Sequence, residues 1–187
     1  MNFFTSDLHF GHKNIVDYTN RGKVIPEGVS LTQWLVDIWK RQVRPTDTVY
    51  HLGDFAFLHQ KKAIQLLTEL PGNKVLIHGN HDSDKFCKEV KDVPNVSSYF
   101  YKEIKIQEIP TILFHFPISI WHKQHHGSYH LFGHSHGNFV PEQGFLLDVG
   151  IDSAYNIYGE HRFFTEADIL AYMSKRTKTP PRDHHRD

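Results

Sequence analysis

Short apolar runs alternate with amphipathic stretches along the first half of the chain. The runs have the length of buried strands and cover residues 2–6, 48–52 and 74–78. Between them, apolar residues recur at helical spacing, first behind Ser30 as a helix N-cap and again over residues 60–70. Strands separated by helices are typical of an α/β architecture.

The pattern changes in the second half. Apolar and charged residues interleave over residues 101–109, as in a half-exposed strand. Thr165 and Asp168 have the spacing of a capping box and predict a last helix. Further strands are predicted at residues 111–114, 129–132 and 145–149. The two halves together predict an α/β (α+β) fold class.

The length and composition predict one globular domain. A chain of 187 residues can build a sizeable core. We expect residues 1–175 to form this domain and the charged, proline-containing residues 176–187 to be a disordered tail. Lys plus Arg and Asp plus Glu both number 21, so the charge balance favours neither a stable nucleic-acid complex nor a membrane partner.

The single cysteine, Cys87, excludes an internal disulfide and indicates a reducing compartment. No apolar run reaches membrane-spanning length, and the N-terminus lacks a signal pattern. A cytoplasmic location is therefore expected.

Metal-type side chains stand at five places where an apolar run gives way to a glycine or polar turn. The five motifs are Asp7-Leu8-His9, Gly53-Asp54, Gly79-Asn80-His81-Asp82, His115 and Gly133-His134-Ser135-His136. Carboxylate, amide and imidazole groups are the ligands that divalent cations prefer. If their segments are extended, Asp7 and His9 point to one side, and so do the two histidines of the last motif. Ligands collect at the carboxyl ends of strands in open α/β sheets, where these residues would sit.

Each motif has a simpler explanation when taken alone. Gly53-Asp54 is most often just a turn. His115, between Phe114 and Phe116, fits a hydrogen-bonded core histidine. The two imidazoles between glycines at residues 133–137 are the most specific signal. Only the joint, ordered occurrence of all five motifs favours a dinuclear metal hydrolase.

The ordered set resembles the calcineurin-like metallophosphoesterase superfamily, in its compact bacterial, archaeal and phage phosphodiesterase-phosphatase branch. The family pattern of Asp-x-His, Gly-Asp, Gly-Asn-His-(Asp/Glu), His and Gly-His-x-His is present in order over roughly residues 1–150. The resemblance implies two mixed β-sheets packed face to face with helices outside, a four-layer αββα sandwich. It also implies two divalent metal ions, with Mn²⁺ favoured and Fe, Zn²⁺ or Ni²⁺ as alternatives.

The resemblance also assigns roles to individual residues. The first ion would be held by Asp7, His9, Asp54 and His136, and the second by Asp54, Asn80, His115 and His134. His81 would face the substrate as a catalytic residue, with Asp82 orienting its ring. Outside the motifs, the residue types suggest further substrate-binding candidates. Arg21, beside Asn20 and Gly22 in a long loop, could clamp a phosphate, and His12 could donate to ligands or to phosphate. Trp121 and His122 could stack on or cap a base or aryl leaving group.

The predicted reaction is hydrolysis of a small phosphate ester, by attack of a metal-bridging hydroxide on phosphorus. Phosphodiesters, cyclic or short nucleotides among them, are favoured, and a phosphomonoesterase acting on nucleotides or proteins is the first alternative. A nuclease is less favoured because the charge is balanced and no further domain is seen. A protein-binding scaffold of the same fold would be expected to lack ligands that are intact here. The sequence does not indicate an oligomeric state.

Overall fold

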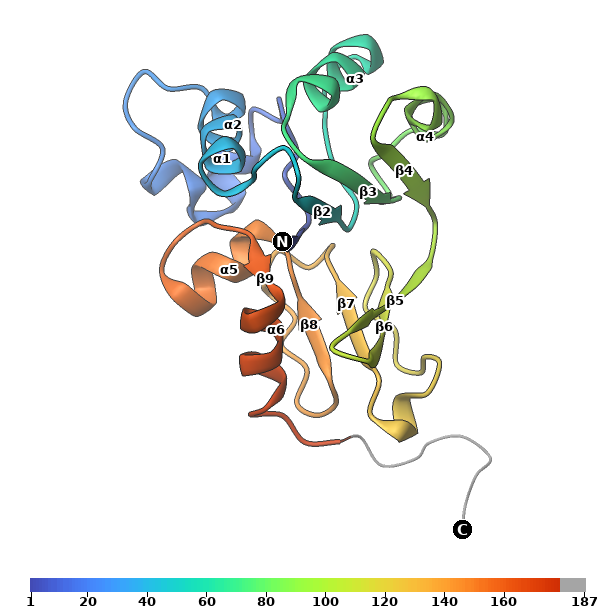
Figure 1. Ribbon diagram of the computed structural model, residues 1–187. Helices are drawn as coiled ribbons and strands as arrows, with labels where there is room; N and C mark the ends of the chain where they lie inside the picture. The colour runs from blue at the N-terminus through green and yellow to red at the C-terminus, as the bar shows by residue number, and fades with distance from the viewer. Residues whose placement is uncertain (179–187) are drawn as a thin grey trace.

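Two β-sheets packed against each other form the centre of the computed structural model, which describes residues 1–178 (Figure 1). One sheet has five strands in the order β4-β3-β2-β1-β9, and the other has four in the order β5-β6-β7-β8. Both contain parallel and antiparallel pairs, so the predicted α/β class with two mixed sheets is confirmed. Of the tail expected to be disordered, residues 179–187 lie outside the described residues.

The first sheet and its helices come from the first half of the chain and its end. Its strands are β1 (Asn2–Thr5), β2 (Thr48–His51), β3 (Asn73–Ile77), β4 (Val96–Tyr99) and β9 (Phe164–Thr165). Strands β1 to β4 are parallel, and β9 is antiparallel to β1. The parallel strands are connected by α2 (Leu31–Gln42), α3 (Gln60–Glu69) and α4 (Asp84–Glu89). The predicted helix starts are confirmed at Ser30, whose side chain accepts a hydrogen bond from the Gln33 amide, and near Gln60.

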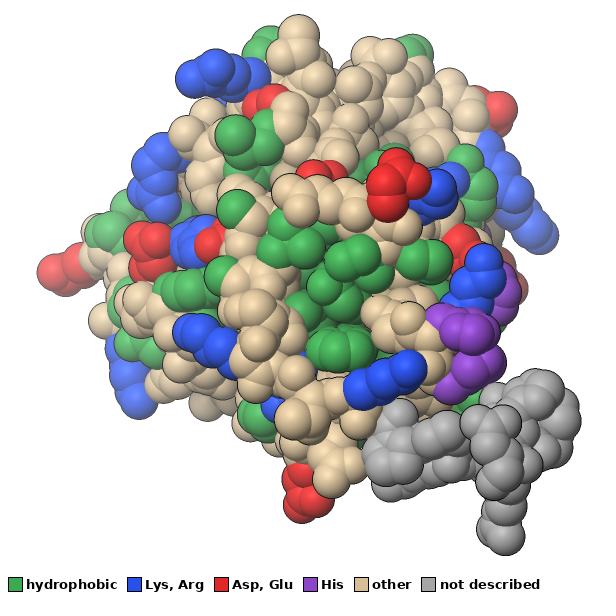
Figure 2. Space-filling model, turned by 60° about the horizontal axis from the view of Figure 1, so that its bottom comes forward, with side chains coloured by type: hydrophobic (Ala, Val, Ile, Leu, Met, Phe, Trp, Pro, Cys, Tyr) green, Lys and Arg blue, Asp and Glu red, His purple; other side chains and the backbone are tan. Residues whose placement is uncertain are grey.

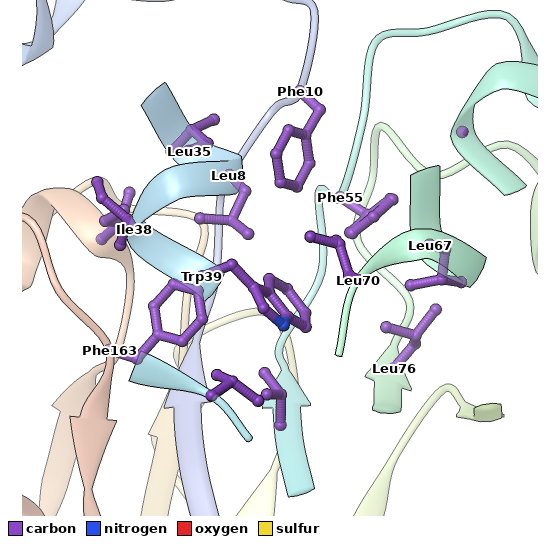
Figure 3. Packing of buried hydrophobic residues seen from close by; sticks show 14 of the residues in the cluster. Leu8, Phe10, Leu35, Ile38, Trp39, Phe55, Leu67, Leu70, Leu76 and Phe163 are labelled. Atoms are coloured by element: carbon purple, nitrogen blue, oxygen red, sulfur yellow. The ribbon is translucent and has the colours of Figure 1, made fainter. Parts of the chain in front are cut away.

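The helices α2, α3 and α4 bury the outer face of this sheet. Strand residues such as Val49 and Leu76 pack there against Leu35, Trp39 and Leu67 of the helices, as Figure 3 shows for most of these side chains. The Trp39 indole also donates a hydrogen bond to the Pro71 carbonyl at 3.0 Å. Because burial of each large apolar side chain contributes roughly 1.5–3 kcal/mol, this cluster anchors the strands whose ends carry the motifs.

The second sheet begins with a hairpin that the sequence pattern did not resolve. Its strands are β5 (Lys102–Ile106), β6 (Ile109–Leu113), β7 (Tyr129–Phe132) and β8 (Leu146–Asp148). The single strand predicted over residues 101–109 is divided by a two-residue turn, in which Gln107 and Glu108 both have positive φ angles. Such turns usually carry Asn-Gly or Asp-Gly, so this one lacks the usual sequence signal.

The inner faces of the two sheets share one apolar cluster. Phe4 and Ile77 of the first sheet pack there with Leu131 and Leu147 of the second. Two helices, α5 (Ile151–Tyr158) and α6 (Glu166–Met173), contribute Ala154, Ile169 and Met173 to the same cluster. The capping box predicted at the start of α6 is present, with both of its hydrogen bonds. Helix α5 was not predicted.

The outer face of the second sheet is covered by a loop, whereas helices cover that of the first sheet. Ile112, Phe132 and Leu146 pack there against Trp121, which belongs to the loop between β6 and β7. In the described part of the chain, this loop with its short 3₁₀ turn at Gln124–His126 occupies the place of the expected outer helix layer.

Hydrophobic side chains also gather on the surface at the lower end of the molecule in Figure 1, with charged side chains around them (Figure 2). Within residues 1–178, no helix has both the length and the apolar character needed to cross a membrane.

Candidate metal centre

The five motifs meet where strands of the two sheets end. Asp7, Asp54 and Asn80 follow β1, β2 and β3, while His115 and His134 follow β6 and β7. Beyond the last residues of β1 and β2 the two segments stay paired. The Asp7 amide donates to the Gly53 carbonyl and the His9 amide to the Asp54 carbonyl, each at 3.0 Å. The expected position at the carboxyl edge of the sheets is therefore observed.

The backbone at these motifs is unusual. The φ angles are +57° at Asp7, +51° at His9, +59° at Asp54, +68° at His134 and +49° at His136. Non-glycine residues rarely adopt this left-handed region, and each such residue costs of order 1–3 kcal/mol. The expectation of extended i, i+2 pairs is thus wrong in its backbone, although the side chains of Asp7 and His9 still meet, at 3.9 Å. Strain repeated at these positions indicates that function, not folding, selects the conformation.

Packing holds the strained segments in place. Leu8 and Phe10, which alternate with the polar residues of the first motif, are fully buried, as is Phe55 after the second. All three side chains point into the apolar cluster beneath α2 and α3 (Figure 3). A Cβ atom added at Gly79 would lie 2.2 Å from Asp54 Oδ1, so only glycine leaves room for that carboxylate.

One group of possible ligands combines Asp7, His9 and His136, whose ligand atoms all lie within 4.8 Å of one another. Both ring nitrogens of His9 are buried and have no hydrogen-bond partner among the described residues. Burial lowers the pKa of His9 to about 3, which keeps the ring neutral. A buried, unpaired polar ring is costly, and a neutral imidazole is the form that binds metals. The donor set and this unsatisfied ring fit a bound cation.

The second group combines Asp7, Asp54 and His115, again within 4.8 Å. Asp54 Oδ2 lies 3.5 Å from His115 Nε2 and 3.7 Å from His9 Nε2, between the rings assigned to the two ions. Burial raises the pKa of Asp54, but the hydrogen bond and charge of His115 outweigh it and lower the pKa to about 2. This position is compatible with a shared ligand, although Asp7 also belongs to both groups.

Asn80 connects the remaining imidazoles. Its Oδ1 atom lies 3.0 Å from His115 Nε2 and 3.0 Å from His134 Nδ1. The His134 amide in turn donates to both carboxylate oxygens of Asp7. All seven predicted ligands are therefore joined in one continuous cluster, while their division between two ions stays a prediction.

Arg21 is not the phosphate clamp that the sequence suggested. The side chain is fully buried, and it donates to Asp152 through Nε at 2.9 Å and through Nη2 at 2.7 Å. Its remaining contacts are with the backbone carbonyls of Asp7 and Leu8. Asp152 Oδ2 also lies 2.8 Å from His136 Nδ1, so this pair fixes the ring orientation of a predicted ligand. The segment carrying Arg21 thus supports the cluster of predicted ligands through Asp152 and through the backbone of the first motif.

Two carboxylates that hold the ligand cluster in place, Asp148 and Asp152, were not predicted from the sequence. Asp148 accepts hydrogen bonds from the amides of Gly137 and Gly150, at 2.9 and 2.7 Å, and from the Ser135 hydroxyl. It therefore holds the turn of the last motif. The available signal for Asp148 was a carboxylate at the end of the apolar run 145–147, with Gly150 two residues further on.

Asp82 does not orient His81. One carboxylate oxygen accepts hydrogen bonds from the amides of Asp54 and Gly79, and the other from the amide of Phe55, each at 2.9 Å. Its oxygens are directed at backbone donors because the two turns converge on this half-buried side chain. The predicted catalytic role of Asp82 is therefore corrected to a structural one.

Replacing Asp82 by alanine should leave these backbone donors without their acceptor. We expect the free energy of unfolding to fall by about 1–3 kcal/mol, the usual cost of an unsatisfied buried group. Urea unfolding followed by circular dichroism measures the change, with Asp37→Ala on the exposed face of α2 as the control. Equal midpoints for the two variants would contradict the structural role.

The other candidate residues are divided between the cluster and the far face of the second sheet. His81 is exposed beside the cluster, with its ring centroid 5.6 Å from that of His9, and His12 lies 5.8 Å from the same ring. Trp121 is instead buried in the outer apolar cluster and donates to the Ser128 carbonyl, which corrects its predicted role as a substrate platform. His122 pairs with Glu103 at 2.9 Å, so its described contact lies outside the cluster.

Comparisons with known proteins find relatives that have no assigned activity. The chain is 34% identical over 146 residues to the uncharacterized protein MJ1445 of Methanocaldococcus jannaschii, an alignment that covers 77% of this chain and 74% of that protein. It is 26% identical over 188 residues to the gene 66 protein of Mycobacterium phage D29, covering 83% and 89% of the two chains. No protein-family model matches the chain.

One solved structure supports the fold. The crystal structure of AQ665 from Aquifex aeolicus, a protein of unknown function, has a TM-score of 0.63 at 24% identity and covers 92% of this chain and 98% of that one. An archaeal phosphodiesterase has a TM-score of 0.48 at 21% identity, covering 80% and 82%. A similarity at that level carries no argument about the reaction.

Proposed function

The chain belongs to the same family as the uncharacterized MJ1445 of Methanocaldococcus jannaschii, and we propose from its own site that it is a metal-dependent phosphoesterase, with phosphodiesters as its preferred substrates. The observation that carries this proposal is the convergence of the motif side chains in strained turns around a buried, unpaired His9. The hydrogen bonds within the cluster leave both ring nitrogens of His9 without a partner, and a bound cation would supply one.

The charge of the site favours an anionic substrate. Two divalent cations would bring a charge of about +4, and the carboxylates of Asp7 and Asp54 would remove about 2 of it. Asn80 and neutral imidazoles remove none. The whole chain, with Asp7 and Asp54 included, has no net charge, since it contains 21 basic and 21 acidic residues. A phosphate ester matches this local excess better than a peptide does.

Different residues of the chain have different roles in the proposed hydrolysis. When bound, divalent ions activate water and neutralise charge on a phosphoryl group. The motif side chains hold and orient these ions, and the Arg21–Asp152 pair keeps His136 in place. His81, exposed beside the cluster, donates a proton to the leaving oxygen as its bond to phosphorus breaks. Water supplies the incoming oxygen, so no covalent enzyme intermediate is needed.

The shape of the surface supports diesters over monoesters. Two hollows share Leu58 as a wall, one of about 260 Å³ bordered by Phe57 and His81 and one of about 600 Å³ bordered by His12. An open-chain phosphodiester carries two organic groups and can place one in each hollow, whereas a cyclic one carries a single organic group. A monoester has a single organic group and leaves one hollow without a ligand.

An activity panel tests the proposal. The full chain, supplied with Mn²⁺, is assayed with an aryl phosphodiester, an aryl phosphomonoester, 2′,3′- and 3′,5′-cyclic nucleotides and single-stranded DNA. We expect the highest kcat/KM with one of the small diesters. Dominant monoester hydrolysis would favour the phosphatase alternative, and cleavage of DNA alone would favour the nuclease. No hydrolysis of any substrate with any of the four metals would refute the proposal.

Metal removal should destabilise the protein. At a free metal concentration a hundred times the dissociation constant, binding stabilises the native state by about 2.7 kcal/mol. For a chain of this size that corresponds to a melting temperature roughly 5–10 °C higher. Differential scanning fluorimetry before and after chelation measures the shift, and addition of Mn²⁺ should restore it. An unchanged melting temperature after proven metal loss would contradict a metal centre at this position.

A further inference from the structure

Phe57 is an exposed aromatic side chain that no apolar cluster accounts for. Its relative exposure is 45%, and it lies three residues after Asp54. Its neighbours Ala56 and Leu58 both pack against the cluster beneath α2 and α3, but Phe57 itself belongs to none of the apolar clusters of the described residues. Core packing therefore does not explain a phenylalanine at this position.

The ring of Phe57 stands among imidazoles at the mouth of the metal centre. Its centroid lies 4.2 Å from that of His12, 4.9 Å from His81 and 5.4 Å from His9. It thus lies beside a predicted ligand, beside the proposed proton donor and beside a residue at the edge of the larger hollow. A group attached to a phosphate at the centre would come within reach of this ring.

The backbone holds Phe57 firmly. Its amide donates to the Phe10 carbonyl at 2.9 Å, and the Phe10 amide donates to the Phe55 carbonyl at 3.0 Å. A β-bridge between Phe10 and Ala56 joins the same two segments. The ring is thus presented from a fixed backbone, which lowers the entropic cost of binding a ligand against it.

The hollow bordered by His12 is suited to an organic group. Its volume of about 600 Å³ falls in the range of small-molecule pockets. Most of its side chains are aliphatic, and Lys13 adds a positive charge at its exposed edge. Its aliphatic walls come from Val16, Ile25, Val29, Leu31 and Leu58. A pocket with such walls suits a flat, largely apolar group, and its edge at His12 lies next to the ring of His9, a predicted ligand.

We infer that Phe57, which borders the smaller hollow with His81 and lies next to His12 at the edge of the larger one, stacks on a planar aromatic group of the phosphate ester, either an aryl ring or a nucleobase. This inference rests on the proposed function, because the phosphate of the same molecule occupies the metal centre. Stacking of one base on an aromatic side chain is worth roughly 5- to 150-fold in affinity. The site therefore selects aromatic esters over alkyl esters.

Direct binding to the Mn²⁺-loaded full chain tests this site. Isothermal titration calorimetry compares inorganic phosphate, methyl phosphate, phenyl phosphate and adenosine 5′-monophosphate. We expect phenyl phosphate to bind at least about 5-fold more tightly than methyl phosphate, the lower end of the stacking range. Adenosine monophosphate binding more tightly than phenyl phosphate would identify a nucleobase as the preferred group, and the reverse order would identify an aryl ring.

Variants separate the ring from the metal centre. Phe57→Ala should abolish the preference for phenyl over methyl phosphate and leave the affinity for inorganic phosphate unchanged, while Phe57→Trp should retain the preference. Phe139→Ala is the matched control, because Phe139 has a similar exposure of 46% and borders a different hollow. Melting temperatures should stay equal, since Phe57 is in no apolar cluster.

The outcomes distinguish the two proposals. If inorganic phosphate binds but the aromatic preference is absent, or persists in Phe57→Ala, the inference about Phe57 is overturned and the phosphoesterase proposal stands. If neither phosphate nor any of its esters binds to the metal-loaded protein, both proposals fail.

Discussion

Asp54→Asn should abolish hydrolysis and release metal. The Asp54 carboxylate lies between the imidazoles of His9 and His115, and its other oxygen accepts a hydrogen bond from the His81 amide at 2.8 Å. Loss of even a hydrogen-bond partner of a ligand costs roughly 10–100-fold in metal affinity, so loss of a shared ligand should cost more than about 100-fold. Elemental analysis after dialysis should find fewer than two ions per chain.

The asparagine variant keeps the shape of the side chain, so its fold should persist. Circular dichroism checks this point, and Asp92→Asn, at an exposed position after α4, serves as the control. The shared position of Asp54 would be wrong if the variant still held two ions at full occupancy after dialysis.

His81→Ala should have the opposite signature, with metal retained and turnover lost. The side chain is exposed beside the cluster and is not needed to complete either group of possible ligands. A general acid contributes about 10²–10⁴-fold, so kcat should fall at least about a hundredfold. The loss should be largest for esters with a basic leaving group, because these depend most on protonation. Steady-state kinetics with aryl and alkyl leaving groups measures it.

His59→Ala is a suitable control for this substitution. His59 precedes α3 and makes no side-chain capping hydrogen bond, so its removal should leave kcat unchanged. A His81→Ala enzyme that keeps its activity with alkyl leaving groups would remove His81 from the mechanism, whatever its metal content.

The ligand cluster could be predicted because the sequence features that mark each ligand lie within a few residues of it. Each motif places polar residues at the end of an apolar run, three of the five directly after a glycine, and the strand order then brings the motifs together. Gly79 illustrates this: the glycine visible in the sequence is the residue that leaves room for the Asp54 carboxylate. The hairpin at Gln107 and Glu108 was missed for the converse reason, because ordinary residues occupy a turn that usually requires glycine or asparagine.

The supporting residues could not be predicted because their partners are distant in sequence. Arg21 and Asp152 are separated by 131 positions, and nothing near either residue indicates the other. An arginine next to asparagine and glycine in a long loop suggested an exposed anion-binding residue, whereas the tertiary fold buries it. Helix α5 was missed because Gly150 at its N-terminus gives no side-chain cap, whereas the equally long α6 begins with a capping box. Gly159 at the C-terminus of α5 was the one stop signal.

Asp82 shows the limit of arguing from adjacency. It follows His81 directly and appeared suited to orienting that ring, yet its carboxylate is occupied by amides of two other turns. In strained turns, neighbouring side chains diverge, so proximity in the sequence does not establish contact.

The buried pair of Arg21 and Asp152 also has an evolutionary consequence. Removing one member leaves a desolvated charge without compensation, a loss of roughly 3–5 kcal/mol that exchange of both members avoids. Among homologues, the two positions should therefore covary, both being kept or both being replaced by neutral residues. A genome search that scores the five motifs but ignores this covariation would accept degenerate copies in which His136 has lost its anchor.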